Sequence, residues 1–439
     1  MTAADAPAPD ATREPEPMQG RGFGRLWFSA GASNLADGVL FAGLPVLALQ
    51  VTDSPALVAG VAVALQLPMA LGALPAGVLA DRVDRRRLLV GVNVLRGLGL
   101  LAATIAVLAG ELHLAIIYAV AALAGGSEML VDTTAQTAVP MLVPREDLGK
   151  ANARLGGTQV LLNDAIGAPV GAFLAGVGAA IILGGSGVLF AVAAVVLRRL
   201  HLRTTRPVDA STATDAPDGS DTGGPMEETP VPIRQQLRDG VQFLAGQPAL
   251  RRIAVANGVH NFGAVAFVAV FPVFVVEVLG LAPWTFGWFL AAIAVGGVLG
   301  AVVSDAILKR IGLGRLVRIT SLLVALTIAA IGITANAAVT GVGFVLIGVC
   351  GMLWNVGVRV LRQELVPEEL LGRVTATMGF VALVAAPLGG LLGGLVAEVF
   401  GLRWPVALAV ATLLTARLLL QGLQVELPPT PVDESPAPR

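Results

Sequence analysis

The stretch ALVAGVAVALQLPMALGALPAGVLADRVDRRR, residues 56–87, decides the fold of this chain. Its first 25 residues carry no charge, and the following seven contain Arg82, Arg85, Arg86 and Arg87. A helix needs about 20 mainly apolar residues to cross the hydrocarbon core of a bilayer. The stretch therefore predicts a membrane-spanning helix that ends in a basic loop.

The same pattern recurs along all 439 residues, of which 55% are hydrophobic and only 13% charged. Soluble domains are about a quarter charged. Strands of a membrane barrel would alternate polar and apolar residues, whereas these runs are continuously apolar. We therefore expect an all-α membrane protein with twelve transmembrane helices in two pseudo-symmetric six-helix bundles, at roughly 26–50, 56–80, 88–110, 113–140, 152–176, 178–198, 250–279, 284–307, 317–335, 337–362, 372–397 and 402–423.

The loops between these stretches alternate in charge. The basic residues fall in every second loop and in the long central segment, whereas the loops near Asp53, Glu111, Gly178, Gly280 and Asn336 have none, and Arg403 is the one exception. Lys and Arg are enriched in cytoplasmic loops. The alternation predicts a multi-pass protein of the cell inner (plasma) membrane with both termini in the cytoplasm.

The chain divides into two related halves. LVPREDLGKANA (142–153) matches LVPEELLGRVTA (365–376) at a shift of 223 residues, and the same shift places Asn34 and Asp37 on Asn257 and His260. Residues 207–232 are polar and rich in Pro and Gly, which is typical of a flexible linker. The expected parts are a disordered tail (1–21), an N-terminal bundle (22–200), a linker (201–247), a C-terminal bundle (248–424) and a second tail (425–439). Parallel repeats of this kind place the substrate site between the halves.

One loop resembles a family signature. Residues 77–86, GVLADRVDRR, resemble the G-x-x-x-D-R-x-G-R-R motif of the major facilitator superfamily, with Asp84 where the motif has Gly. The resemblance implies a latch that joins the halves on the cytoplasmic side in the outward-facing state, formed by Gly77, Asp81, Arg82, Arg85 and Arg86 with the repeat copy Asp305, Lys309 and Arg310. The alternative is that the arginines act only as topology signals.

A second motif bears on the direction of transport. Gly167-Ala-Pro169-Val-Gly171 partly resembles the Gly-Pro motif of antiporters in the superfamily, where the fifth helix bends. The stretches 33–55 and 151–176 resemble the drug-exporter branch that includes macrolide and enterobactin efflux proteins. Gly and Pro also serve plain helix packing in membranes, so the motif favours export without excluding a structural role.

Charged residues inside the expected spans are candidates for function, because burying a charge in the bilayer costs at least ~2.5–3.5 kcal/mol. Asp37 lies near the middle of the first span with Asn34 on the same face, and we expect Asp37 to carry the proton. Glu128 is the second proton-coupling candidate. Arg96 could pair with either acid. The alternative for Asp37 is an acid fixed by helix–helix hydrogen bonds.

The other half offers a weaker set of candidates. His260 occupies the repeat position of Asp37. We expect the substrate cavity to be lined by polar and aromatic residues of both halves: Asn34, Arg96, Asn257, His260, Trp354 and Asn355. A lone membrane histidine is more often a packing residue. Four further charged residues lie in or near the spans. We expect Asp132 to form an ion pair at the cytoplasmic edge, and Arg359 and Arg362 to extend their side chains to the membrane surface. Asp164 has no assigned role.

The sequence has no GxxxxGK[ST] loop, so ATP hydrolysis cannot drive the protein. With three His and one Cys a metal site is improbable, and we expect no cofactor and no enzyme activity. The leading hypothesis is a monomeric, proton-coupled exporter of a small hydrophobic molecule, with the lipid bilayer, protons and the substrate as its partners and no nucleic acid. The alternatives are uptake of a small solute and a non-transporting receptor or assembly factor.

The loop charges predict which side of the membrane holds the linker. Protease added to right-side-out vesicles should leave residues 207–232 uncut, whereas the same vesicles opened with detergent should be cut there. Efficient cleavage in sealed vesicles would contradict the topology.

Overall fold

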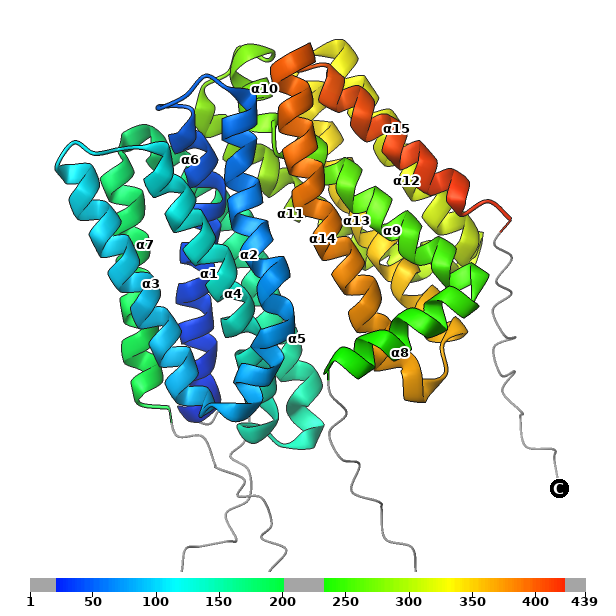
Figure 1. Cartoon of the computed structure of the whole chain (residues 1–439), viewed down its shortest axis with the longest axis horizontal. Helices are drawn as coiled ribbons and strands as arrows, with labels where there is room; N and C mark the ends of the chain where they lie inside the picture. The colour runs from blue at the N-terminus through cyan, green and yellow to red at the C-terminus, as the bar shows by residue number, and fades with distance from the viewer. Residues whose placement is uncertain (1–20, 201–232, 423–439) are drawn as a thin grey trace, which may run out of the picture.

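The computed structural model describes residues 21–200 and 233–422, excluding the side chains of 21, 73–82, 233–239, 368 and 369. All regular structure in these ranges is helical (Figure 1). In a bilayer, backbone N–H and C=O groups find no water, so a continuous apolar segment satisfies them internally as a helix. This constraint, rather than amphipathicity, accounts for the architecture.

The N-terminal half contains six spans. They are α1 (Arg21–Ala48), α2 (Pro55–Arg82), α3 (Arg85–Leu108), α4 (Leu114–Ala138), the composite fifth span and α7 (Ala179–Arg198). The fifth span joins α5 (Leu148–Gln159), the π-helical segment η3 (Val160–Gly167) and α6 (Ala168–Val177), and the short turns η1 (Val139–Met141) and η2 (Arg145–Asp147) precede it.

The C-terminal half begins with α8 (Ile233–Gly246), a helix in the last part of the expected linker. Its spans are α9 (Pro248–Val268) continued by α10 (Phe271–Glu277), then the turn η4 (Pro283–Thr285) with α11 (Phe286–Ile311), followed by α12 (Leu313–Thr334), α13 (Ala337–Leu365), α14 (Glu368–Phe400) and α15 (Trp404–Leu419).

Eleven helices of the described residues are long and apolar enough to cross a membrane, and α15 is a shorter apolar helix. The sequence predicted 402–423 for this last span, but the helix covers only 16 residues. That is about 24 Å against a hydrocarbon core of about 30 Å. Arg417 in its last turn has a long side chain that can extend towards the membrane surface.

The two halves use the same packing scheme. In the N-terminal half α2 packs on α4, α3 on α7, and α1 on both α6 and α7; the equivalent pairs α11 with α13, α12 with α15, and α9 with α14 and α15 pack in the C-terminal half. Helices α2 and α4 approach closely because Gly125 faces the Leu65 carbonyl, and α11 and α13 because Gly348 faces the Ile293 carbonyl. Gly125 and Gly348 are 223 residues apart, the shift found in the sequence.

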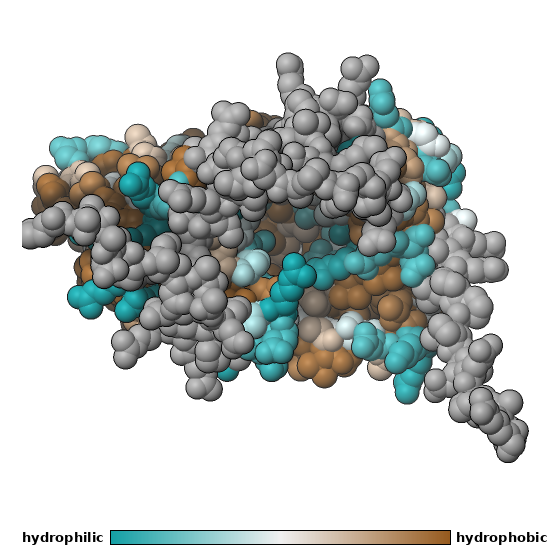
Figure 2. Space-filling model, turned by 90° about the horizontal axis from the view of Figure 1, so that it is seen from below, coloured by the Kyte–Doolittle hydropathy of each residue, from teal (hydrophilic) through white to brown (hydrophobic). Residues whose placement is uncertain are grey.

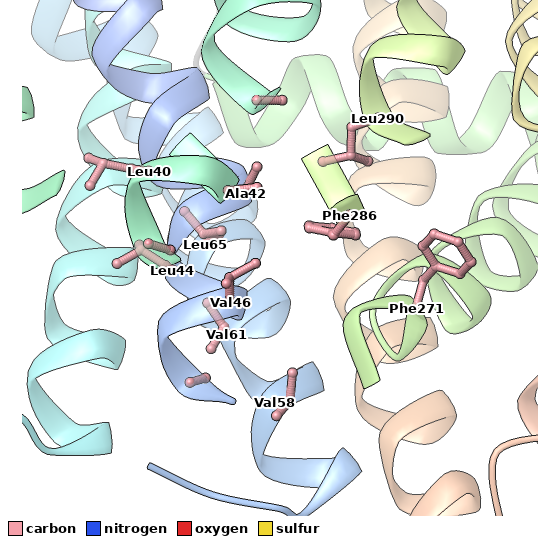
Figure 3. Close-up of a cluster of buried hydrophobic side chains, with 14 of the residues drawn as sticks. Leu40, Ala42, Leu44, Val46, Val58, Val61, Leu65, Phe271, Phe286 and Leu290 are labelled. Atoms are coloured by element: carbon pink, nitrogen blue, oxygen red, sulfur yellow. The ribbon is translucent and has the colours of Figure 1, made fainter. Parts of the chain in front are cut away.

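The apolar core is continuous between the halves on one side of the membrane. Figure 3 shows side chains of α1 and α2 on one side of Phe286 and Leu290 of α11, and Phe271 of α10 on the other side. Here α2 packs on α14 and α6 on α11, and two glycines permit the approach: Gly394 faces Ala56 and Ala59, and Gly287 faces Ala168 and Pro169.

Polar contacts between the halves converge on Glu398 of α14. Its carboxylate accepts hydrogen bonds from Ser54 Oγ (2.6 Å) and from the Ala56 backbone N–H (3.3 Å) at the start of α2. A helix N-terminus offers unpaired N–H groups and a partial positive charge, so a carboxylate is stabilised there. Among the described residues, no other hydrogen bond joins the two halves.

The opposite face carries the basic ends of the helices. Arg85, Arg198, Arg251 and Lys309 all lie at helix ends on the face of α8, where the helices of the halves diverge (Figure 1). Figure 2 views this face from below and shows hydrophilic side chains gathered on it, with hydrophobic ones on the flank. The structure therefore holds the halves together on the side of the loop at 49–54 and apart on the other.

Removal of the Glu398 carboxylate should loosen the closed side. In Glu398→Ala, loss of the charge-assisted hydrogen bonds should reduce the ratio of closed to open molecules about fivefold, since such a partly exposed contact contributes about 1 kcal/mol. Spin labels at the exposed positions Asp53 and Arg403, one in each half, should report a larger population at long distances. Glu277→Ala, an exposed acid of the same half, is the control; an unchanged Glu398→Ala distribution would refute the role.

Candidate functional site

The centre of the N-terminal bundle contains a charged network built around Arg96 of α3. The Arg96 side chain is 1% exposed. Its guanidinium donates hydrogen bonds to Ser33 Oγ (3.1 Å), Asp37 Oδ2 (3.1 Å), the Ala124 carbonyl (3.2 Å) and Ser127 Oγ. The Phe190 ring of α7 lies 4.8 Å from the guanidinium carbon. One arginine thus ties together α1, α3, α4 and α7.

Asp37 forms the acidic half of this buried ion pair. Its Oδ2 lies 3.1 Å from Arg96 Nη1, and the two side chains are 5% and 1% exposed. Its other oxygen, Oδ1, is buried and has no hydrogen-bond partner. A carboxylate with a free buried oxygen can accept a proton there without losing its bond to arginine. The structure therefore resolves the pairing that the sequence left open, in favour of Asp37.

Three more acids lie around the pair. Asp37, Asp132, Asp164 and Arg96 all act electrostatically on Glu128 of α4. Asp132 accepts a hydrogen bond from Gln159 Nε2 (3.4 Å), so the ion pair expected at this position is not seen among the described residues. Asp164 is exposed, in the π-helical segment of the fifth span. The N-terminal bundle therefore has more buried or half-buried acids than cations at its centre.

The C-terminal bundle has a polar cluster in the equivalent place. The His260 and Trp354 rings stack with centroids 4.1 Å apart and an interplanar angle of 9°. Trp354 Nε1 donates to Asn257 Oδ1 (3.1 Å), and His260 Nδ1 is buried without a partner. Asn355 is exposed on α13 next to this cluster. Three of the four expected cavity residues of this half are thus in direct contact with one another.

Sequence reasoning missed several members of both clusters. Ser33, Ser127 and Phe190 contact Arg96, and Asn261 Nδ2 donates to the Asn257 carbonyl (2.8 Å). The available signal was helical spacing, because Ser33 lies one turn before Asp37 and Asn261 one turn after Asn257. Asn34, by contrast, is buried beside Asp37 but has no hydrogen bond to a described residue.

The sequence model of the Major Facilitator Superfamily matches residues 26–387. This chain belongs to that superfamily. The multidrug efflux pump Tap of Mycolicibacterium fortuitum is 26% identical over 400 residues, covering 86% of this chain and 90% of its own. The enterobactin exporter EntS of Escherichia coli O1:K1 / APEC is 26% identical over 367 residues, covering 82% of this chain and 81% of its own. In fold, the chain is similar to a mutant of the nucleoside transporter NupG (TM-score 0.72, 11% identity, 91% of this chain and 98% of that one).

Membership in the superfamily makes the chain a secondary transporter of a small molecule and not an enzyme. The efflux activities belong to relatives at 26% identity.

The residues of the superfamily latch motif make contacts within their own half. Arg85 Nε donates to Thr137 Oγ1 (3.3 Å), and Arg86 donates to the Arg198 carbonyl. The repeat copy Asp305, Lys309 and Arg310 is exposed on α11 without a hydrogen bond or ion pair to a described residue. Gly77, Asp81 and Arg82 lie at the end of α2, and their side chains are outside the described set. A bridge between the halves on this face therefore stays a prediction for the other conformation.

The departure from the superfamily motif has a local explanation. Asp84 is the N-cap of α3, and its Oδ1 accepts a hydrogen bond from the Arg87 backbone N–H (2.8 Å). Aspartate is among the best N-cap residues, typically worth about 1 kcal/mol relative to alanine. Asp84 thus starts the third span in place of the motif glycine.

The antiporter-like motif lies where the fifth span meets both halves. Gly167 faces Gly38 and Gly171 faces the Val39 carbonyl, both on α1, whereas Pro169 packs against Gly287 of α11. The π-helical segment η3 ends at Gly167, two residues before Pro169. The small residues of the motif therefore allow α1 and α11 to pack closely on the fifth span, next to its π-helical segment.

Arg96→Gln should destabilise the protein more than Asp37→Asn. Removal of one partner of a buried ion pair costs about 3–5 kcal/mol, and Arg96 also supports two serines and a carbonyl. Asparagine keeps the size and an acceptor oxygen for Arg96. Thermal unfolding of the purified protein, followed by tryptophan fluorescence, should show a clearly larger drop in midpoint for Arg96→Gln.

The exposed Arg252→Gln substitution is the control and should leave the midpoint unchanged. Equal losses for Arg96→Gln and Asp37→Asn would show that the pair alone, and not the wider network, provides the stability.

Proposed function

We propose that this transporter exports a small, hydrophobic molecule in exchange for protons. The observation that carries the proposal is the buried pair of Arg96 and Asp37 with Glu128 close by. It lies in the N-terminal bundle, facing a C-terminal bundle whose central cluster contains an unpaired histidine nitrogen.

Charge balance supports an exchangeable proton at this site. One guanidinium neutralises one carboxylate, and Arg96 already pairs with Asp37. Glu128, inside the membrane, has no hydrogen bond or ion pair to a described residue. An unpaired charge within the bilayer is costly, so the free energy is lower when one of the two acids, Glu128 or Asp37, is protonated and neutral. Movement of that proton between the two acids would change whether Arg96 is bonded to a charged or to a neutral Asp37.

The arrangement of the halves supports a transport cycle. If the linker face is cytoplasmic, as the loop charges predict, the structure is the inward-open state, closed outside by Glu398, Gly287 and Gly394. Substrate then enters from the cytoplasm, and the halves rock to the outward-open state, with Asp81 and its basic neighbours joining them on the inner face. Protons from outside neutralise Asp37 or Glu128 and return the halves.

The apolar character of the spans favours a hydrophobic substrate. Apart from the Arg96 network and the His260–Trp354 cluster, buried polar side chains are mostly serines and threonines, and many of these bond to carbonyls of their own helix. Sugar or nucleoside recognition requires several free polar groups. The efflux names of Tap and EntS point the same way. Proton-coupled uptake is the second candidate.

A vesicle assay tests the direction and the coupling together. Inside-out vesicles with an imposed proton gradient, acid inside, should accumulate a hydrophobic cationic dye faster than vesicles without a gradient. Transport that ignores the gradient would indicate facilitated diffusion, and gradient-driven accumulation only in right-side-out vesicles would indicate uptake.

Asp37→Asn should remove the gradient-dependent part of transport and keep substrate binding, because asparagine cannot ionise. Glu128→Gln is measured beside it, and Asp53→Asn, an exposed acid in a loop, is the control. A structural role for Asp37 predicts the opposite result: Asp37→Asn would transport almost normally, and Asp37→Leu would lose both transport and folding.

A further inference from the structure

An apolar groove runs along the outer surface of the N-terminal bundle, on the far side from the proposed transport site. It lies between α3 and α7, the helices at the outer edge of this bundle in Figure 1, and has a volume of about 350 Å³. Gly97 of α3 and Gly184, Gly187 and Ala191 of α7 line it. The exposed side chains of Leu98 and Val188 flank these small residues.

The groove has the length of a lipid chain. Its lining on α7 extends from Gly184 to Arg198, which at 1.5 Å per residue is about 21 Å. One leaflet contributes about 15 Å of the hydrocarbon core. The polar side chains in the lining are Asn93, which is buried and bonded to the Leu89 carbonyl, and Arg198 at the end of α7. The groove is thus apolar along its length and charged at one end.

Arginines from three helices meet at that end. Arg86 of α3 donates a hydrogen bond to the Arg198 carbonyl, and Arg25 of α1 donates one to the Arg199 carbonyl. A guanidinium has five N–H donors, so Arg86 keeps donors for a further acceptor. Within the described residues, no carboxylate lies at ion-pair distance from Arg86 or Arg198.

We propose that this groove binds one anionic glycerophospholipid, with its phosphate between Arg198 and Arg86 and an acyl chain along Gly97, Gly184 and Ala191. Arginine binds phosphate through paired, charge-assisted hydrogen bonds, and basic pockets between helices on the cytoplasmic side bind anionic headgroups. Rows of small residues leave the space that a chain needs.

Two other grooves in the outer surface provide an internal comparison. One lies between α14 and α15 and is lined by Trp404 and Ala411 among others; the other lies between α12 and α13 and is lined by Ala330 and Val342 among others. Neither has a charged residue in its lining. Both can hold any acyl chain, whereas the groove of α3 and α7 selects a headgroup by charge.

A second copy of the chain is the competing occupant, because Gly187 and Ala191 are spaced as small residues in paired membrane helices. In a parallel twofold dimer through this face, Arg198 of each copy would lie on the same side of the membrane. These arginines, which have no carboxylate at ion-pair distance among the described residues, would then repel one another. Charge therefore favours the lipid.

Native mass spectrometry of the full chain tests the proposal, with phosphatidylglycerol and phosphatidylcholine of the same acyl chains as probes. The wild type should retain phosphatidylglycerol over phosphatidylcholine. Arg198→Gln should weaken phosphatidylglycerol binding about fivefold, the effect of one basic residue near a membrane surface. Ala191→Leu, which fills the groove from an exposed position, should weaken binding of both lipids, and Ala411→Leu in the uncharged groove should not reduce the preference.

Equal retention of the two lipids by the wild type, or unchanged binding in both Arg198→Gln and Ala191→Leu, would overturn the proposal. A wild-type dimer that Ala191→Leu converts to a monomer, with lipid retention unchanged, would assign the groove to contact between copies of the chain. Each variant is first compared with the wild type by gel filtration, and since Arg198 and Ala191 are both exposed, folding is expected to be preserved.

Discussion

The N-terminal bundle depends on one buried charge, the guanidinium of Arg96. A cation inside a bilayer is tolerated only where it is neutralised and its donors are satisfied. Asp37 supplies the charge, and two serines and a backbone carbonyl supply the remaining acceptors. Because these partners come from α1 and α4 while Arg96 lies on α3, the pair fixes how three spans pack and also concentrates polar groups at one place in an apolar protein.

In the proposed function, the same pair is also where the bundle responds to protons. A neutral Asp37 would leave Arg96 without its counter-ion, and Glu128 on α4 has no hydrogen bond or ion pair to a described residue. A change in protonation at Asp37 would therefore act on the residue that links α1, α3 and α4. The C-terminal bundle has no such charge at the repeat position: His260 is stacked on Trp354 and stands where Asp37 stands in the other half. The two halves thus share the helix packing, whereas the buried ion pair lies in the N-terminal half.

Much of the fold follows from the sequence. The length and hydropathy of the apolar runs predict the membrane spans, and the charges of the loops predict how the spans are oriented. The helical spans were predicted from the sequence, and Gly125 and Gly348 show its 223-residue shift again as matched close helix contacts. The short α15 was not predicted, since apolar residues continue beyond the point where the helix ends. The choice of Asp37 over Glu128 as the partner of Arg96 was also open, because helical spacing gives the face and depth of a side chain but not the neighbour that it meets.

The contacts that join the halves in this structure were not predicted, since the sequence motif implied contacts on the opposite, basic face. Glu398 reaches the start of α2 across more than 340 positions of sequence, and nothing in the local pattern around it distinguishes it from an ordinary loop acid. Such contacts arise only when both bundles are assembled. They explain why the structure is closed on one side, and they share no residue with the charged network in the N-terminal bundle.

The most direct test of this account is substrate-induced proton release from detergent-solubilised protein near neutral pH. If Asp37 carries the proton, the wild type should release protons on addition of substrate, Asp37→Asn should release none, and Glu128→Gln should still release them. If Asp37→Asn releases protons as the wild type does while Glu128→Gln does not, the Arg96–Asp37 pair is structural and the proton belongs to Glu128.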